Sequence, residues 1–309
     1  MTASLTTHDP VLLDFAEAVG AEGPVAIAGG RTRWDVGGPS TPGTRVITAP
    51  AGVVDHTAAE MTVTVRAGTP VAELHDVLRR AGQRSALPER GGTVGGAVAV
   101  GENDYRALGR GLLRSSVLQV RYVSAEGRMV TTGGPTVKNV TGFDLPRLIV
   151  GSLGTLGLVA EVILRTNPIP ARSQWIVAQG VDPQAAWDTV LAPGAVLWDG
   201  TSTWVLVEGH SADVKAEHRS LRSLGDFHEV DGGPPLPPHR WSLTPAASAA
   251  LDGDATGAFV SCVGLGLVFA ERPQPTRPLD PAVQALSAAV KQKFDPSGRL
   301  NPGRDPGAR

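Results

Sequence analysis

The chain has 309 residues with 41% hydrophobic and 19% charged side chains, and its formal net charge is −2 at pH 7. This length suffices for two domains with cores of their own. The small net charge gives no reason to expect nucleic acid or an anionic membrane surface as a partner. The sequence holds a single cysteine, Cys262, which excludes an internal disulfide and a thiolate-bound metal cluster and favours a reducing compartment.

The chain carries no sequence signal for a membrane or for export. No apolar run approaches the roughly 20 residues that a membrane-spanning helix needs. The N-terminal sequence MTASLTTHDP has no basic segment followed by an apolar core, as a signal peptide would have. We therefore expect a cytoplasmic protein without direct membrane insertion, whose membrane association, if any, comes through partners.

The first half alternates strands with short helices. Apolar runs bounded by turn residues predict strands at 24–28, 45–50, 61–68, 117–123, 128–133 and 157–166. Period-two alternation places Met61, Val63 and Val65 on one face of the third strand. A helix is expected over 69–82, with Thr69 as its cap and Gly82 at its exit. A shorter helix is expected at 143–151, where Asp144 can cap it.

The second half has the order of a different α+β fold. Strands and helices are predicted in sequence at 173–180, 183–192, 194–200, 202–209, 211–225 and 226–230, with Ser211 as the cap of the second helix. This β-α-β-β-α-β order is ferredoxin-like. A proline-rich segment, a hairpin over 257–271 and a helix over 280–294 follow. We expect two domains, 1–168 and 169–309, both α+β.

Three glycine-rich loops are the main candidates for a binding site. They are AGGRTRW (28–34), GGTVGGAVAVG (91–101) and GSLGTLG (151–157). Without a side chain, backbone N–H groups can approach phosphate oxygens closely, and positive φ angles are accessible. One such loop is more often a set of turns, and the spacing fits neither a dinucleotide-binding Rossmann fingerprint nor a Walker loop. Three of them together indicate an extended diphosphate ligand.

The segment GGPTVKNVTGFDLPRLIVGSLGTLGLVAEVILRTNP resembles the flavin domain of the vanillyl-alcohol-oxidase-like (PCMH-type) flavoproteins. Within that superfamily the chain is most similar to the FAD-binding subunits of bacterial glycolate oxidases. AGGRTRW is similar to the pyrophosphate loop, GGTVGGAVAVG to the second flavin loop, and KFDPSGRLNPG (293–303) to the C-terminal ending. The resemblance implies a PCMH-type FAD-binding domain of two α+β subdomains, followed by a shortened ferredoxin-like domain.

The resemblance also implies the residues that contact noncovalently bound FAD. The first loop would donate backbone N–H groups to the pyrophosphate, the second would pass along pyrophosphate and flavin, and the third would fold back beside them. The expected cofactor-binding residues are Ala28, Gly29, Gly30, Arg31, Thr32, Gly92, Thr93, Val94, Gly95, Gly96, Gly151, Gly154, Thr155, Gly157, Val159 and Val162.

Several single side chains are open to two interpretations. Arg31 and Arg33 can neutralise phosphate or simply be exposed loop residues. Lys138 and Asn139 can face the flavin or form a structural turn. His210 and His218 lack the convergent partners of a metal site, so we expect no metal. Cys262 is expected to be buried and inert, and we expect His75 at the surface or its boundary.

The chain departs from flavoproteins that oxidise 2-hydroxy acids alone. It has no H-x-G-D-G-N-x-H-like cluster in its second half and no histidine in the first two loops for covalent flavin attachment. No catalytic residue is therefore singled out. The resemblance implies a hetero-oligomer with a larger flavoprotein subunit and an iron–sulfur subunit, because one cysteine cannot ligate a cluster. Its substrate would be a small 2-hydroxy acid, which would leave as a 2-oxo acid.

Two other functions remain open at this point. The chain can be a non-catalytic flavin-binding or assembly subunit, which the short second domain and the lack of catalytic histidines favour. It can also be a stand-alone FAD-linked dehydrogenase of another small substrate. Turnover by the purified chain with an artificial electron acceptor separates the two.

Overall fold

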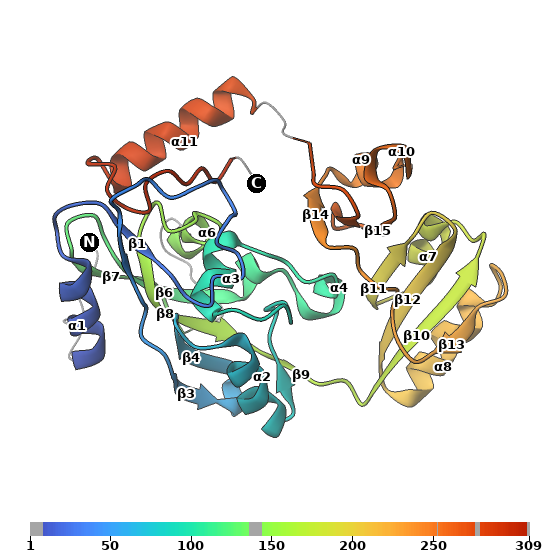
Figure 1. Ribbon diagram of the computed structural model, residues 1–309. Coiled ribbons are helices and arrows are strands. Elements are labelled where there is room, and N and C mark those ends of the chain that lie inside the picture. Colours follow the sequence, from blue (N-terminus) through green and yellow to red (C-terminus); the bar gives the residue numbers. More distant parts are fainter. Residues whose placement is uncertain (1–8, 136–143, 252, 276–278, 308–309) are drawn as a thin grey trace. The chain divides into compact units, whose positions relative to one another are not determined.

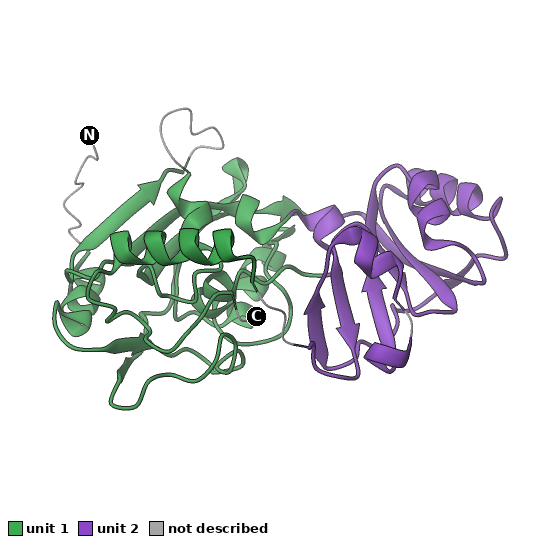
Figure 2. Cartoon of the chain, turned by 90° about the horizontal axis from the view of Figure 1, so that it is seen from above, with its two compact units in different colours: residues 1–104, 112–168, 277–309 green, residues 105–111, 169–276 purple. Residues whose placement is uncertain are grey.

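The computed structural model describes residues 9–135, 144–251, 253–275 and 279–307. They form two compact units, which Figure 2 shows in different colours. Unit 1 comprises residues 1–104, 112–168 and 277–309, and unit 2 comprises 105–111 and 169–276. The C-terminal segment 277–309, which the sequence led us to place in a second domain, packs with unit 1 instead.

Unit 1 is built on a five-stranded antiparallel sheet. Its strands run in the order β3 (Val53–Thr57), β4 (Thr62–Arg66), β8 (Leu158–Arg165), β6 (Val117–Val123) and β7 (Met129–Gly133). The central strand β8 is buried from Leu158 to Leu164, because it is paired on both sides and covered on both faces. Val63 and Val65 of β4 join the same core.

Short helices surround this sheet (Figure 1). They are α1 (Pro10–Val19), η1 (Ala58–Glu60), α2 (Val71–Arg80), α3 (Val94–Val100), α5 (Leu113–Ser116) and α6 (Leu145–Ile149). Two residue pairs join β5 (Gln83–Arg84) to β9 (Asn167–Pro168). Helix α2 buries Val71, Leu74 and Leu78 on one face, as the helical spacing predicts.

A second, small sheet brings the C-terminal segment into unit 1. Strand β1 (Val25–Ile27) pairs in parallel with β2 (Arg45–Ile47), and Val25 also bridges Leu300. Helix α11 (Pro281–Phe294) precedes this contact, and Figure 1 shows it on the same side of unit 1 as β1. The first glycine loop leaves β1 directly, so the C-terminal segment lies next to it.

Unit 2 contains a seven-stranded antiparallel sheet. Its order is β13 (His228–Val230), β10 (Arg172–Gln179), β12 (Ser202–Gly209), β11 (Pro193–Trp198), β15 (Phe259–Cys262), β16 (Leu267–Ala270) and β14 (His239–Ser242). The helices are α4 (Ala107–Arg110), α7 (Pro183–Thr189), α8 (Ser211–Leu221), α9 (Pro245–Ala249) and α10 (Gly253–Thr256). Phe227, Ile176 and Val205 are among the buried residues beneath α7 and α8.

Several sequence-based expectations about local structure are wrong in detail. Met61 is 43% exposed and lies in the left-handed region after η1, outside the alternating face. Thr69 does not cap α2; it accepts a hydrogen bond from the Gly52 N–H and donates one to the Arg66 carbonyl. His210 precedes α8, so Ser211 is its first residue. His75 is buried against Ser85.

Two other expectations, which concern the single residues Asp144 and Cys262, hold. Asp144 caps α6 by accepting from the Arg147 N–H, and Cys262 is buried. Among the described helices, none is long and apolar enough to cross a membrane. Within the same described ranges, no cluster of histidine, cysteine and carboxylate side chains is suited to hold a metal ion.

Candidate functional site: a cleft between the glycine loops of unit 1

A cleft in unit 1 brings parts of all three glycine loops together. The expected cofactor-binding residues that line it are Ala28, Gly29, Gly30, Arg31, Thr32, Thr93, Gly95, Gly96, Gly154 and Val159. The first loop follows β1, the second begins α3, and the third precedes β8. Segments about fifty to sixty residues apart in the sequence thus line one cleft.

The first loop exposes a run of backbone donors to the cleft. The N–H of Ala28 donates to the Ile47 carbonyl and fixes the loop to β2. The next four N–H groups, from Gly29 to Thr32, have no acceptor among the described residues. Arg31 has a φ of 54°, which curls the loop. Successive free N–H groups in such a loop form an anion-binding concavity.

Aromatic and cationic groups close the end of the first loop. Two guanidinium groups contact the indole ring of Trp34, that of Arg31 at 5.1 Å and that of Arg304 at 4.8 Å from the ring centroid. Burial lowers the pKa of Arg304, and the nearby charge of Asp35 partly offsets that effect. All three side chains line the cleft, so its wall carries positive charge held in place by stacking.

Arg33 is anchored by an ion pair across two loops. Its guanidinium pairs with Glu102, and its Nη1 donates to the Gly91 carbonyl at 2.9 Å. Glu102 also pairs with Arg90 at 2.5 Å, and the carboxylate side chain is 1% exposed. Nη2 of Arg33 is buried without a protein partner. A fixed guanidinium with one free donor is suited to an anionic ligand oxygen.

The second loop is helical where the sequence suggested a loop. Val94–Val100 forms α3, and Thr93 caps it by accepting from the Gly96 N–H at 3.3 Å. The N–H groups of Val94 and Gly95 donate to the carbonyls of Thr69 and Ala67. These two donors are therefore already used within the protein. A Cβ on Gly95 would lie 2.7 Å from Ala67 Cβ, so this glycine permits close packing of α3 against β4.

The third loop contributes less to the cleft than expected. Leu153 and Gly154 reach it, together with Val159 of β8. Gly151 packs against Gly101, and Gly157 packs against the ring of Tyr122. Thr155 donates to the Ser152 carbonyl at 2.7 Å. Most of this loop thus serves to fold the chain back between α3 and β8.

Six of the expected cofactor-binding residues do not line the cleft: Gly92, Val94, Gly151, Thr155, Gly157 and Val162. Val94 and Val162 lie in the hydrophobic core. Gly92 lies directly behind the first loop, where a Cβ would be 2.7 Å from Arg33 Nη1. It supports the cleft without lining it. Lys138 and Asn139 fall outside the described residues.

Other residues that line the cleft were not among the sixteen expected cofactor-binding residues. They are Ile27, Arg33, Trp34, Val36, Ala49, Ala67, Gly68, Ala99, Val100, Leu153, Asn301 and Arg304. Arg33 and Trp34 belong to the first glycine loop, AGGRTRW, so the sequence could have assigned the whole of that loop to the site. Asn301 lies within KFDPSGRLNPG (293–303) and Arg304 follows it directly, and only the resemblance of that ending pointed to them. No local pattern says that the C-terminal segment returns to β1.

The fold and the cleft define the class of this protein. Residues 6–133 match the family model described as FAD binding domain. This match indicates an FAD-binding domain within the chain, with FAD as its cofactor. The structure is also similar to alkyldihydroxyacetonephosphate synthase, with a TM-score of 0.69 at 14% identity, over 96% of this chain and 74% of that one. At that identity the similarity shows the fold alone.

Relatives of known identity share this domain. The chain is 30% identical over 215 residues to glycolate oxidase subunit GlcE of Escherichia coli, covering 66% of this chain and 61% of that protein. It is 39% identical over 98 residues to glycolate oxidase subunit GlcD of Bacillus subtilis, covering 32% of this chain and 21% of that one. D-lactate dehydrogenase of Archaeoglobus fulgidus is 39% identical over 105 residues, 33% of this chain and 24% of that one. The chain therefore spans about three fifths of the first of these relatives and about a quarter of the other two.

Proposed function

We propose that this chain is the FAD-binding subunit of a glycolate-oxidase-like complex that oxidises a small 2-hydroxy acid to a 2-oxo acid. The observation that carries the proposal is the cleft of unit 1, whose first loop offers four unpaired N–H groups beside a fixed guanidinium. Bound there, FAD would supply a hydride acceptor for the α-carbon of the substrate. The similarity to glycolate oxidase subunits and D-lactate dehydrogenase supports this substrate class.

The residues present fit the cofactor. The N–H groups of Gly29 to Thr32 would bind the diphosphate, and Arg33 would neutralise part of its charge. Gly29 has no room for a Cβ because Thr93 is in contact with it, so the backbone stays open toward the ligand. Apolar groups along the rest of the cleft, such as Ile27, Val100 and Leu153, exclude water.

The finer assignments belong to the same proposal. All sixteen expected cofactor-binding residues remain our proposed site, with the ten that line the cleft in direct contact and the other six in support. Attachment of FAD is noncovalent. We propose 1–168, completed by the C-terminal segment that packs with unit 1, as the FAD-binding part. We propose the rest of the region from 169 onward as a shortened ferredoxin-like domain, for which the order β13-β10-β12-β11 is the supporting observation.

The proposed complex contains further subunits. A larger flavoprotein would bind the 2-hydroxy acid, and an iron–sulfur subunit would take the electrons away. The complex would be cytoplasmic, with any membrane association arising through these partners. The names of the relatives, which are subunits of one oxidase, support the hetero-oligomer.

The experiment that tests the cofactor is an absorbance spectrum of the purified chain before and after heat denaturation. We expect flavin bands, with FAD released into the supernatant because it is held noncovalently. A colourless protein that also takes up no added FAD would overturn the proposal. Flavin that stays with the denatured chain would contradict noncovalent attachment.

A second candidate is an assembly subunit whose FAD does not turn over. The short second half of the chain and the lack of an H-x-G-D-G-N-x-H-like motif in its sequence favour it. Purified FAD-loaded chain, assayed with a 2-hydroxy acid and an artificial electron acceptor, separates the two functions. Turnover by the chain alone excludes the assembly function, whereas turnover only after adding the partner subunits supports the complex.

A further inference from the structure

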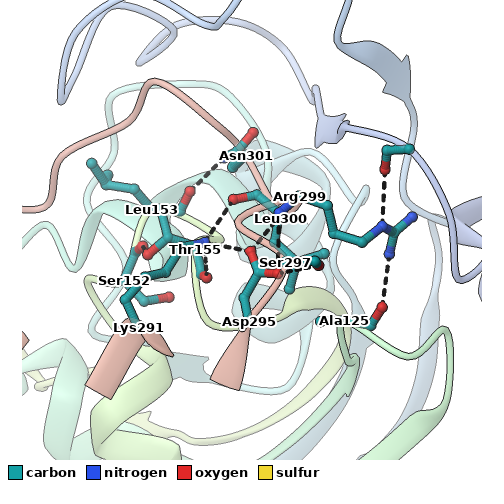
Figure 3. Close-up of polar contacts among 11 residues, drawn as sticks. Ala125, Ser152, Leu153, Thr155, Lys291, Asp295, Ser297, Arg299, Leu300 and Asn301 are labelled. Atoms are coloured by element: carbon teal, nitrogen blue, oxygen red, sulfur yellow. Dashed lines mark hydrogen bonds and ion pairs between the residues drawn. The ribbon is translucent and has the colours of Figure 1, made fainter. Parts of the chain in front are cut away.

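Asn301 lines the cleft and carries a buried hydrogen-bond acceptor that has no partner among the described residues. The residue is 9% exposed and lines the same cleft as the first glycine loop. Its Nδ2 donates to the Leu153 carbonyl (Figure 3). That bond distinguishes the nitrogen of the amide from its oxygen. The oxygen, Oδ1, is buried and has no hydrogen-bond partner among the residues that the structure describes. A buried polar atom of this kind calls for a ligand or an ordered water.

The backbone holds Asn301 in a conformation that suits this role. Its φ of 48° lies in the left-handed region, where asparagine is better tolerated than most residues. Its N–H donates to the Val25 carbonyl at 2.8 Å, and the Val25 N–H donates to the Arg299 carbonyl at 2.9 Å. These two bonds attach the residue to β1, immediately before the first loop. The bond to Leu153 attaches it to the third loop.

A buried ionic network fixes the segment that carries Asn301 (Figure 3). Asp295 accepts from Lys291 at 2.5 Å, from the Leu300 N–H at 2.7 Å and from the Arg299 N–H at 3.1 Å. Lys291 also donates to the carbonyls of Thr155 and Leu300. The carboxylate therefore organises the turn after α11, and the lysine ties that turn to the third glycine loop.

Arg299 anchors the other side of the same segment. Its guanidinium donates to five backbone carbonyls, those of Val19, Gly20, Glu22, Gly23 and Ala125. The residue is 5% exposed. With so many bonds to separate loops, the segment is a rigid wall of the cleft, and Asn301 is a preorganised group within it.

We propose that Asn301 is a cofactor-binding residue whose Oδ1 accepts a hydrogen bond from an N–H or O–H group of FAD. The inference rests on the proposed function and extends the site to the C-terminal segment, which none of the glycine loops includes. Chemically, an amide oxygen in this position selects a donor, such as a ribityl or ribose hydroxyl or the flavin imide N–H. It does not suit a phosphate oxygen.

The test compares two variants of the same segment in the full chain. Asn301→Gly removes the side chain and keeps the positive φ free of strain. Ser297→Ala removes one hydrogen bond to Asp295 in the same turn, outside the cleft. FAD binding to the apoproteins is measured by fluorescence titration, with the melting temperature of each apoprotein as a check on folding.

We expect the dissociation constant for FAD to rise about tenfold in Asn301→Gly, the loss of roughly one hydrogen bond. Ser297→Ala should stay within about twofold of the wild type. If Asn301→Gly binds FAD as tightly as the wild type, the inference is wrong. If the wild-type chain binds no FAD, the proposed function fails first, so the two failures are distinguishable.

A second measurement needs no variant and covers the case in which Asn301→Gly does not fold. Hydrogen exchange of peptides spanning residues 295–305 is followed in the wild-type chain with and without FAD. Direct contact predicts slower exchange in this segment on FAD addition, with peptides of unit 2 as the internal reference. Exchange that is unchanged at saturating FAD would mean that only water meets Oδ1, and the inference would be abandoned.

Discussion

Two adjacent glycines show why the surroundings of a residue matter as much as its backbone angle. Gly91 and Gly92 have φ angles of 70° and 77°. A Cβ on Gly91 would meet nothing within 4 Å, whereas one on Gly92 would be in conflict with Thr32 and Arg33 of the first loop. The conformational requirement is therefore the same at both positions, and the steric requirement exists at only one.

The pair gives a matched test of the cleft. Gly91→Ala should lower the free energy of unfolding by only about 1 kcal/mol, because alanine is strained in the left-handed conformation that Gly91 adopts. Gly92→Ala should in addition displace Thr32 and Arg33 and raise the dissociation constant for FAD by at least about tenfold. Urea unfolding and FAD titration of both variants check this. Equal FAD affinities in the two variants would show that the position of Arg33 is irrelevant to binding.

Asp295 is the titratable residue on which the C-terminal segment depends. Burial alone would raise its pKa, but the hydrogen bond from Lys291, the Leu300 and Arg299 N–H groups and the lysine charge outweigh it and lower the pKa below 3.8. A carboxyl group whose pKa is lowered on folding stabilises the protein fully above its unfolded pKa. That stability is lost as the pH falls through the lowered folded pKa.

Asp295→Asn should therefore reduce the free energy of unfolding by about 1–3 kcal/mol at pH 7. The difference from the wild type should be unchanged at pH 5 and should shrink as the pH falls below 3.8. Urea unfolding at several pH values measures it. Asp76→Asn is the control, because Asp76 forms an exposed pair with Arg79 and should change stability by less than about 1 kcal/mol. A difference for Asp295→Asn that does not vary below pH 3.8 would contradict this pKa shift.

Single residues were predictable from sequence where one local requirement decided them. The glycines of the first loop and the cap at Asp144 are of this kind, since each follows from short-range geometry. The role of Gly95 was not, because its N–H is used by Ala67 and its missing Cβ makes room for the same residue. For Gly95 that residue is Ala67, which directly follows β4 and lies about thirty residues earlier in the sequence.

At the scale of elements, α3 shows how packing overrides local preference. The sequence VGGAVAV contains two glycines and three β-branched residues, all of which disfavour a helix. It is helical because Val94, Ala97 and Val98 are buried in the core of unit 1 and Thr93 caps its first turn. Low propensity explains why the segment was interpreted as a loop.

The cap of α3 should matter both for stability and for the site. Thr93→Ala removes the hydrogen bond to the Gly96 N–H and should lower the free energy of unfolding by about 1 kcal/mol. Because the Thr93 side chain also touches Gly29 and lines the cleft, FAD binding should weaken several-fold. Thermal unfolding and FAD titration provide both values.

Thr244 supplies the matching control. It caps α9 of unit 2 in the same way, by accepting from the Ala247 N–H at 3.2 Å. Thr244→Ala should lose a comparable amount of stability and leave FAD affinity unchanged. A similar loss of FAD affinity in both variants would mean that Thr93 acts only through general stability.

At the scale of the whole molecule, the order of elements was predictable and the closure of unit 1 was not. Hydrophobic periodicity and turn residues locate most strands, including the β6–β7 hairpin at Gly127. The return of residues 277–309 to β1 depends on Arg299 and Asp295 meeting carbonyls and N–H groups that no local pattern specifies. The glycine loops therefore predicted about half of the residues that line the cleft. They did not predict the contribution of the C-terminal segment, Asn301 and Arg304.

The division into two units makes ligand binding separable from the rest of the protein. Every residue that lines the cleft belongs to unit 1, and the core of unit 1 is distinct from the clusters of unit 2. Of the six tryptophans, Trp34 lies in unit 1 and the others, Trp175, Trp187, Trp198, Trp204 and Trp241, lie in unit 2. Tryptophan fluorescence thus reports mainly on unit 2.

Scanning calorimetry of the apoprotein should then show two transitions, and tryptophan fluorescence should assign one of them to unit 2. FAD at about 100 times its dissociation constant stabilises the unit that binds it by about 2.7 kcal/mol. For a unit of this size that corresponds to a rise of roughly 5–10 °C in one transition. The transition seen by fluorescence should stay where it is, because FAD contacts no residue of unit 2 in the proposed site. A joint shift of both transitions would mean that the two units unfold as one.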